Sequence, residues 1–482
     1  MTSLKRTLAG LSAFAFTMGL TACGSSLEQP ETTTAATRET TTALTVEVNT
    51  EKNSDEQQEI IDSSVSQLRD EQLDNKTIKW LATWDINPDS TGKTEPVGLS
   101  MFKSKYQGEV KWYQTTWETR YSDLSTYVLS GEGIDFFQRD SMSLPKGVVS
   151  GMFMPVDDYI DLDSELWSPM KPAMENYNFN GKHYALITDV TADNVVVYSK
   201  KTIQENGFED PWELYQSGEW NWDTFTQMLE DFCDPDDEKW GLDGWWTENA
   251  LYLSAGSPAV MSKNGDLTVN LNDPQLEKAM NWMTTLYNKG LVLSKEQFDW
   301  AEQPQYMGEG RELFYICGAW TLQAAPEAWN TKIAPEDAAM VPVPSPAGSD
   351  PYQAASGFGY CLCKGAANPL GVALFAECEL LANSDDSAIE IYKDKCRNDF
   401  KWTEELIEQY YECNALARKY PVAELAAGVS SDVASLTTDG GEQVGLRAAL
   451  HGYDWSTTKE SIANTVQMLV DEVDTDLKSI AN

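Results

Sequence analysis

The pattern of apolar and polar positions separates an N-terminal region without regular period from a long region of alternating strands and helices. Three apolar runs predict β-strands, at 76–84, 110–113 and 134–137. Between the last two, Tyr121, Leu124 and Val128 recur at helical spacing, and Gly131 is placed to end that helix. Strand, helix and strand joined by short links indicate a parallel sheet.

Further helices are marked by their end signals. Asp273 and Pro274 are typical of a helix start, and Gly290 of its end. A second start lies at Asn368 and Pro369. Thr457 and Glu460 have the spacing of a capping box for a final helix. The apolar positions expected to face inward in that helix are Ile462, Val466, Leu469, Val473 and Leu477. No internal repeat occurs in the sequence. The alternation of strands and helices predicts the α/β fold class.

The first residues have the pattern of an export signal. Lys5 and Arg6 precede an apolar run at 8–20 that is too short for an ordinary membrane span. The run ends in LTAC at 20–23, which resembles the lipobox of bacterial lipoproteins. The resemblance implies a signal peptide over 1–22, cleavage before Cys23, and a lipid anchor on the sulfur of Cys23.

The residues after Cys23 predict a tether. Thr, Ser, Ala and Glu dominate the stretch up to residue 50, which offers too little apolar surface to offset the entropy of ordering it. We therefore expect a disordered linker over 23–75. Ile61, Val65 and Leu68 are at helical spacing and leave a short helix open as an alternative.

Charge and cysteine content narrow the function classes. A formal net charge of -41 disfavours nucleic acid and anionic lipid surfaces as partners. The seven cysteines after Cys23 form no metal-binding pattern, so we expect buried free thiols and no cofactor. The acidic run at 234–238 lacks the spacing and glycine of a calcium-binding EF-hand loop and predicts a solvated turn.

A series of short motifs resembles extracellular solute-binding proteins of ABC importers, in the maltodextrin-type family 1. The motifs are LSGEGID at 129–135, MPVDDY at 154–159, NGKHYAL at 180–186, VVYSK at 196–200, GEWNWDTF at 218–225, GRELF at 310–314 and GAW at 318–320. Each motif is weak alone, and their common order along about 400 residues carries the resemblance. Two departures, Ile134 and Ile187 in place of prolines, put local loop geometry in doubt rather than the fold.

The resemblance implies a two-lobed periplasmic-binding-protein-like fold of type II, each lobe a parallel-rich sheet flanked by helices. About 400 residues are natural for two such lobes. We expect the N-terminal lobe to comprise 76–188 with about 348–395. The C-terminal lobe would comprise 189–347 with about 396–482.

Candidate binding residues follow from the rule that ligands bind outside the carboxyl ends of parallel strands. These positions hold Trp84 and Asp85, then Trp117 and Glu118, then Arg139 and Asp140. A tryptophan face packs on the apolar face of a pyranose, carboxylates accept hydrogen bonds from hydroxyls, and arginine donates to ring oxygens. The resemblance adds Trp245, Trp246 and Trp320 from the facing lobe, and Asp189 at the crossover between lobes.

Catalysis has little support in the sequence. The chain has two histidines, and none of the common nucleophile, zinc or phosphate-loop motifs occurs. We therefore expect a monomeric, extracytoplasmic, lipid-anchored receptor, not an enzyme, which passes a carbohydrate, favoured as an oligosaccharide, to the permease subunits of an ABC importer. Two alternatives stay open: a cell-surface glycoside hydrolase, which needs only two suitably spaced carboxylates, and a non-transport carbohydrate-binding or sensory protein.

Overall fold

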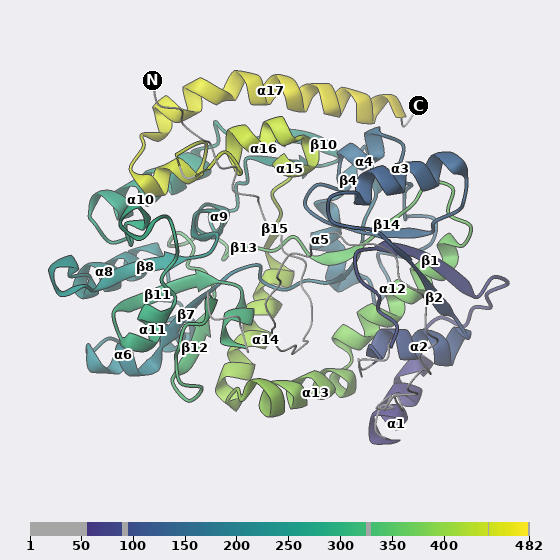
Figure 1. The fold of residues 1–482 in the computed structure, drawn as a ribbon, viewed down its shortest axis with the longest axis horizontal. Coiled ribbons are helices and arrows are strands. Elements are labelled where there is room, and N and C mark those ends of the chain that lie inside the picture. The colour runs from purple at the N-terminus through teal and green to yellow at the C-terminus, as the bar shows by residue number, and fades with distance from the viewer. Residues whose placement is uncertain (1–54, 89–94, 324–328, 442, 481–482) are drawn as a thin grey trace, which may run out of the picture. The chain divides into compact units, whose positions relative to one another are not determined.

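Two mixed β-sheets organise the protein. The computed structural model describes residues 55–88, 95–323, 329–441 and 443–480. One sheet has five strands in the order β2-β1-β3-β14-β6, and the other has four in the order β12-β7-β11-β8 (Figure 1). Within the described residues, no helix is long and apolar enough to cross a membrane.

The first sheet is built on the three predicted strands. Its strands are β1 (Thr77–Ala82), β2 (Glu109–Gln114), β3 (Phe136–Gln138), β6 (Leu186–Asp189) and β14 (Phe358–Leu362). Strand β1 lies parallel to β2 and β3, while β14 runs antiparallel to β3 and β6. Trp80 is fully buried at its centre and stacks on Phe136 with 5.8 Å between ring centroids.

Helices cover this sheet and include two that the sequence predicts. They are α2 (Val97–Tyr106), α3 (Arg120–Ser130), α4 (Lys146–Val149), α5 (Lys171–Glu175), α12 (Pro369–Ser384) and the 3-10 turn η2 (Ser168–Met170). Gly131 ends α3 in the left-handed conformation, as expected. The Asn368 side chain caps α12 by accepting a hydrogen bond from the Gly371 amide at 2.9 Å.

The second sheet alternates with shorter helices. Its strands are β7 (Val195–Ser199), β8 (Trp240–Gly244), β11 (Glu312–Cys317) and β12 (Ala338–Val341). The helices around it are α6 (Lys200–Glu205), α7 (Pro211–Ser217), α8 (Trp222–Phe232), α9 (Thr247–Leu253), α10 (Pro274–Asn288), α11 (Gln305–Glu309) and α14 (Glu404–Lys419). Its 3-10 turns are η3 (Pro235–Asp237), η4 (Lys295–Phe298) and η5 (Ala319–Leu322).

In each large sheet all strands but one run in the same direction, in agreement with the predicted parallel-rich sheets. In the second sheet only β8 and β11 pair in parallel, because β7 runs antiparallel to both of its neighbours. The physical reason is the route of the chain. A strand that arrives from the carboxyl-end edge of one sheet enters the next at the corresponding edge and must run against the strands that end there. Strand β14 enters the first sheet in the same way.

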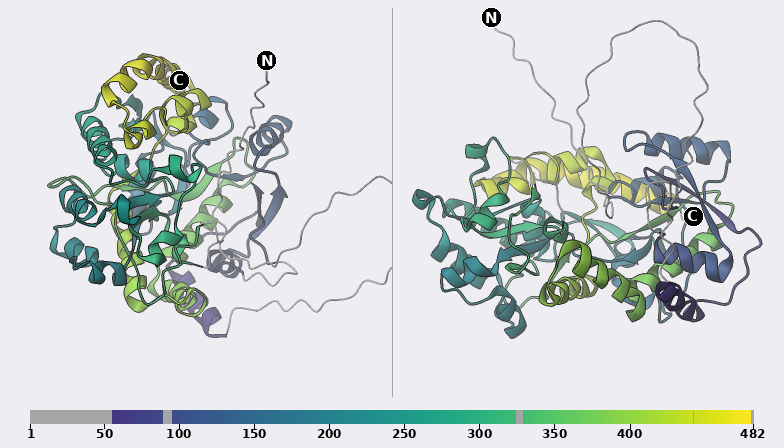
Figure 2. Two further views of the ribbon diagram at one scale, coloured as in Figure 1. Left: turned by 60° about the vertical axis from the view of Figure 1, so that its left-hand side comes forward. Right: turned by 60° about the horizontal axis from the view of Figure 1, so that its bottom comes forward.

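Three small ribbons and a C-terminal group of helices complete the described fold. The ribbons are β4 (Asn178–Phe179) with β5 (Lys182–His183), β9 (Val260–Lys263) with β10 (Asp266–Val269), and β13 (Gln353–Ala354) with β15 (Pro421–Val422). The helices are α13 (Asp386–Lys395), a π turn (Cys396–Phe400), α15 (Ala426–Val429), α16 (Ser431–Thr437), η8 (Arg447–His451) and α17 (Trp455–Ile480). Helix α17 packs on α16, α4 and the β9–β10 hairpin (Figure 1, Figure 2).

The final helix begins earlier than its predicted capping box. The Asp454 carboxylate accepts hydrogen bonds from the amide and the hydroxyl of Thr457, both at 2.9 Å, so Thr457 lies inside α17. An aspartate three residues upstream competes better for the free amides than the predicted threonine. Ile462, Val466 and Leu477 are buried as expected.

The predicted linker over 23–75 differs from the structure in its last part. Helix α1 (Asp55–Ser64) and the 3-10 turn η1 (Val65–Gln67) are formed, and Ile61 is fully buried. The Arg69 guanidinium pairs with Glu377 at 2.9 Å, and Glu377 is almost completely buried in α12. Apolar burial and this ion pair order the segment. The signal peptide, Cys23 and the residues up to 54 lie outside the described residues.

The remaining cysteines and the acidic run behave as the sequence predicts. The seven cysteines in the described residues are unpaired, six of them are buried, and Cys233 is half-buried. Burial raises the pKa of the Cys361 thiol, which argues against a reactive thiolate there. The run at 234–238 is exposed and contains η3.

Candidate ligand-binding site

The candidate residues lie at two strand edges that the chain joins directly. Strand β6 leaves the first sheet at Asp189, and β7 enters the second at Val195. The connecting residues 190–194 can span at most about 20 Å. A second connection runs from the end of β12 through β13 to the start of β14. Both edges that carry candidate residues therefore lie next to the crossover segments.

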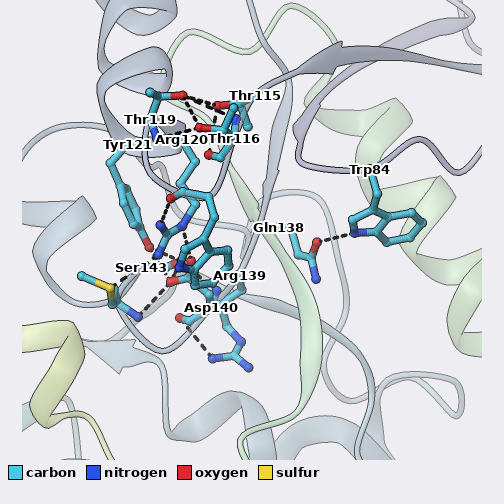
Figure 3. Close-up of polar contacts among 12 residues, drawn as sticks. Trp84, Thr115, Thr116, Thr119, Arg120, Tyr121, Gln138, Arg139, Asp140 and Ser143 are labelled. Atoms are coloured by element: carbon cyan, nitrogen blue, oxygen red, sulfur yellow. Dashed lines mark hydrogen bonds and ion pairs between the residues drawn. The ribbon is translucent and has the colours of Figure 1, made fainter. Parts of the chain in front are cut away.

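Trp84 is held in a fixed orientation at the first edge. Its indole N–H donates a hydrogen bond to the Gln138 side chain at 3.0 Å (Figure 3). Its ring packs edge-on against Trp80 at 4.7 Å between centroids. The neighbouring Asp85 carboxylate accepts hydrogen bonds from the amide and the side chain of Asn87 at 3.0 and 2.7 Å. Both side chains are half-buried, which leaves part of each accessible.

Trp117 stacks on an arginine that the sequence analysis did not single out. The guanidinium carbon of Arg120 lies 3.6 Å from the centroid of Trp117 and 4.6 Å from that of Tyr121. The same guanidinium donates to the Asp140 carboxylate at 2.8 Å and to the Trp117 carbonyl. Arg120 thus joins the ends of β2 and β3. Glu118 points outward and is exposed.

Asp140 is the most heavily bonded candidate. Beside Arg120, its carboxylate accepts hydrogen bonds from the Tyr121 hydroxyl, the Met142 amide at 2.8 Å and the Ser143 hydroxyl at 3.1 Å (Figure 3). Burial and the adjacent carboxylate raise the pKa of Tyr121 far above its usual value, so this phenol stays a donor. Asp140 therefore acts first as an organiser of the loop after β3.

Arg139 faces the crossover rather than open solvent. It is buried, and its guanidinium donates to the carbonyl of Gly357 and lies 4.8 Å from the Tyr177 ring centroid. Its Nε is buried without a hydrogen-bond partner among the described residues. Contact of Arg139 with a ligand therefore requires a change at the crossover.

Asp189 is the last residue of β6, where the chain leaves the first sheet. It pairs with Arg418 of α14 at 3.2 Å, and 26% of its side-chain surface remains exposed. Desolvation nevertheless raises the pKa of Asp189, against the opposing effect of Arg418. Asp193, which is exposed, has its pKa raised by the same cause. Both carboxyl groups are therefore crowded by protein atoms at the start of the crossover.

The second edge is aromatic. Trp246 contacts Trp245 at 5.5 Å between centroids, Trp245 contacts Trp329 at 5.7 Å, and Trp329 contacts Trp320 at 5.5 Å. These four residues are called the tryptophan row below. The side chain of Asn194, on the crossover, donates to the Trp245 carbonyl at 3.3 Å. The row is therefore attached through Trp245 to the segment that joins the two sheets.

Trp246 adopts a conformation that is unusual for a bulky residue. Its φ is 60°, in the left-handed region, and 39% of its surface is exposed. This conformation costs on the order of 1–2 kcal/mol for a residue other than glycine. An exposed ring held at such a cost is a candidate for ligand contact.

The structure brings most of the predicted residues into two groups. Trp84, Arg139 and Asp140 lie around the ends of β1 and β3, with Trp117 attached through Arg120, while Asp189 stands at the crossover. Trp245, Trp246 and Trp320 join through Trp329. The sequence analysis missed Gln138, Arg120, Trp329 and Arg418. Gln138 directly precedes Arg139 at a strand end and could have been found by the same rule.

Two cavities lie away from the candidate residues. A cavity of about 590 Å³ is lined by residues of α10 and the second crossover, and one of about 180 Å³ lies beside Thr321 and Trp402. Neither is lined by any of the ten candidates. Among the residues that the structure describes, no group of three or more His, Cys, Asp or Glu could hold a metal ion.

The profile of the bacterial extracellular solute-binding protein family matches residues 99–394. The chain belongs to this family. The predicted resemblance is thereby confirmed, as is the expectation that the chain is not an enzyme, since the family consists of binding proteins of ABC transporters. Family membership also implies an extracytoplasmic location. No curated protein sequence matches the chain.

Solved structures of solute-binding proteins share the fold. The cyclic alpha-maltosyl-1,6-maltose binding protein from Arthrobacter globiformis is 12% identical, covers 82% of this chain and 99% of its own, and gives a TM-score of 0.58. A cyclo/maltodextrin-binding protein complexed with maltotetraose is 16% identical, with 82% and 97% covered and a TM-score of 0.55. The extracellular solute-binding protein from Staphylococcus aureus in complex with maltose is 14% identical, with 84% and 97% covered and a TM-score of 0.54. These likenesses confirm the α/β, periplasmic-binding-protein-like fold.

Proposed function

We propose that this solute-binding protein is the lipid-anchored receptor that captures a neutral oligosaccharide and delivers it to the permease of an ABC importer. The tryptophan row is the single observation that carries the carbohydrate assignment. Indole faces pack on the apolar faces of sugar rings, and four tryptophans in succession suit a ligand of several units. Three of the structural relatives are named for, or contain, maltose-type oligosaccharides.

The first edge supplies the polar half of the proposed site. Asp85 and Asp189 are partly accessible carboxylates that can accept hydrogen bonds from sugar hydroxyls. The arginines near this edge are paired with acids or carbonyl groups, which leaves no concentrated positive charge for an anionic ligand. A neutral sugar therefore fits better than a charged one.

The proposed mechanism is closure of two lobes about the crossover. The N-terminal lobe would comprise 76–188 with about 348–395 and the C-terminal lobe 189–347 with about 396–482. Each large sheet draws its strands from one of these groups, which supports the division. Bending at residues 190–194 would bring Trp84 and the tryptophan row onto one ligand, and the permease would recognise the closed form.

The test is a binding screen of the mature chain. The chain should begin at or before Asp55, because α1 and Arg69 pack on the core. Malto-, cello-, xylo- and manno-oligosaccharide series would be titrated by calorimetry. We expect at least one series to bind and to be recovered chemically intact. Failure of every series to bind would overturn the carbohydrate assignment, and time-dependent cleavage would favour the glycoside hydrolase.

The proposed anchor is tested separately. Cys23 is motivated by the lipobox after a basic, apolar leader. In a bacterial host the wild-type chain should partition with membranes, whereas Cys23→Ala should not be processed to the lipidated form. Equal release of both chains into the soluble fraction would contradict the anchor without bearing on sugar binding.

A further inference from the structure

A second exposed tryptophan lies outside the candidate site. Of the 17 tryptophans, all of which lie in the described residues, only Trp246 and Trp300 expose more than a third of their surface, at 39% and 43%. Both have positive φ, 60° for Trp246 and 64° for Trp300, a conformation that bulky residues rarely adopt. Exposure and strain coincide in these two tryptophans alone, which sets Trp300 beside a residue already proposed to bind ligand.

The loop that carries Trp300 is fastened to the strand end that carries Trp245 and Trp246. The buried ammonium of Lys295 donates to the carbonyl of Gly244, the last residue of β8, at 3.2 Å. The amide of Gln303 donates to the buried Asp243 carboxylate, also in β8, at 2.7 Å. Between these two attachments, the Trp300 amide donates to the Lys295 carbonyl at 2.9 Å. Trp300 is therefore fixed relative to the tryptophan row.

A second route connects the same two tryptophans. Trp246 is the residue before α9, and Glu248 lies in the first turn of that helix. The Glu248 carboxylate contacts the His451 ring nitrogen at 3.4 Å, and the His451 ring lies 5.9 Å from the Trp300 ring between centroids. Trp300 and His451, called the distal patch here, are thus linked through Glu248 to the start of the helix that follows Trp246.

Trp300 offers two kinds of contact to a sugar. In the part of the chain that the structure describes, its indole N–H donates no hydrogen bond, although the neighbouring residues are tightly bonded. An exposed indole with a free N–H can stack on a ring and donate to a hydroxyl at the same time. If Trp300 were a core residue, we would expect its ring to be buried and its N–H to be hydrogen-bonded, as both are in Trp222.

We propose that the distal patch binds the outer units of an oligosaccharide whose inner units occupy the tryptophan row. An oligosaccharide is the occupant we propose because the contacts above link the patch to Trp246. Trp300 also matches Trp246 in exposure and in backbone conformation. This inference rests on the proposed function. It predicts a receptor whose affinity keeps rising with ligand length beyond the units that the row accommodates.

The test measures affinity against length for the mature chain. Whichever of the four oligosaccharide series binds is titrated from disaccharide to hexasaccharide, for wild type, Trp300→Gly and Asp299→Gly. Asp299 also has a positive φ, of 53°, so its glycine variant relaxes the adjacent backbone position while it keeps the Trp300 ring. Trp300→Asn repeats the ring removal with a residue that tolerates the left-handed region.

The expected result separates long from short ligands. Trp300→Gly and Trp300→Asn should lose about tenfold in affinity for the hexasaccharide and less than twofold for the disaccharide. Asp299→Gly should match wild type at every length. Retention of the wild-type length dependence in both Trp300 variants would overturn the distal patch while leaving the proposed function intact. Absence of binding by wild type to all series would instead overturn the proposed function.

Discussion

The two strand edges differ in the kind of side chain that they present and in how those side chains are held. At the first edge, the acids and aromatics are restrained by one another: Arg120 holds Trp117 and Asp140, and Gln138 holds Trp84. At the second edge, Trp246 stands in the left-handed region with an exposed face. The first edge is a pre-organised polar surface, and the second presents apolar faces at a conformational cost. A sugar ring, with polar rim and apolar faces, matches the two together.

The largest expected effect on stability comes from Arg120, which organises the first edge. Its side chain is 8% exposed and that of Asp140 is 15% exposed, so Arg120→Met leaves a buried carboxylate without its cation. We expect the free energy of unfolding to fall by about 3 kcal/mol, measured by urea denaturation. Arg397→Met, which removes exposed ion pairs, is the matched control and should leave the urea midpoint unchanged. Equal effects of the two variants would show that the first edge is not organised by this pair.

A pH titration tests Asp243, a buried carboxyl in β8, the strand that leads to Trp245 and Trp246. Desolvation raises the pKa of Asp243 to about 6, with Lys295 opposing the rise. Because the folded pKa lies above the unfolded one, the contribution to stability is fully present below about pH 4 and is lost as pH rises through 6. We expect a loss on the order of 2 kcal/mol across this window, and a flatter profile for Asp243→Asn. Identical pH profiles for the two proteins would contradict this assignment.

Trp246 and Trp84 should respond oppositely to truncation. Trp246→Gly relieves the left-handed backbone and should raise stability by about 1 kcal/mol while sugar affinity falls about tenfold. Trp84→Ala loses the contact with Trp80 and the bond to Gln138, so its melting temperature should fall. Thermal unfolding and calorimetry on the same samples measure both quantities. A lower melting temperature for Trp246→Gly would mark Trp246 as a packing residue.

Local sequence patterns account for much of the fold. The strands β1, β2 and β3 and the starts of α10 and α12 follow from apolar periodicity and capping residues. The direction of β7 and β14 does not, because it depends on where the chain leaves the other sheet. The sequence left a short helix in 55–75 open but could not decide for it, because Arg69 finds its partner Glu377 far along the chain.

The candidate site, too, could be predicted from the sequence only in part. The strand-end rule leads to Trp84 and Arg139 without knowledge of the fold. The contacts that orient them are made between segments distant in sequence, such as Asp189 with Arg418. Trp329 carries no local signal, and its place between Trp245 and Trp320 emerges only when β8 and β11 pair. Side-chain partnerships of this kind are set by tertiary packing.

The most direct test of a shared carbohydrate site is calorimetry of wild type, Trp84→Ala and Trp320→Ala with the best-binding oligosaccharide. If both edges hold the ligand, each variant should lose about 1–3 kcal/mol of binding free energy, roughly ten- to a hundredfold in affinity. Trp80→Ala, a fully buried control, should instead lose about 3–5 kcal/mol of stability. Unchanged sugar affinity in both Trp84→Ala and Trp320→Ala, with melting temperatures lowered as far as in Trp80→Ala, would contradict the account.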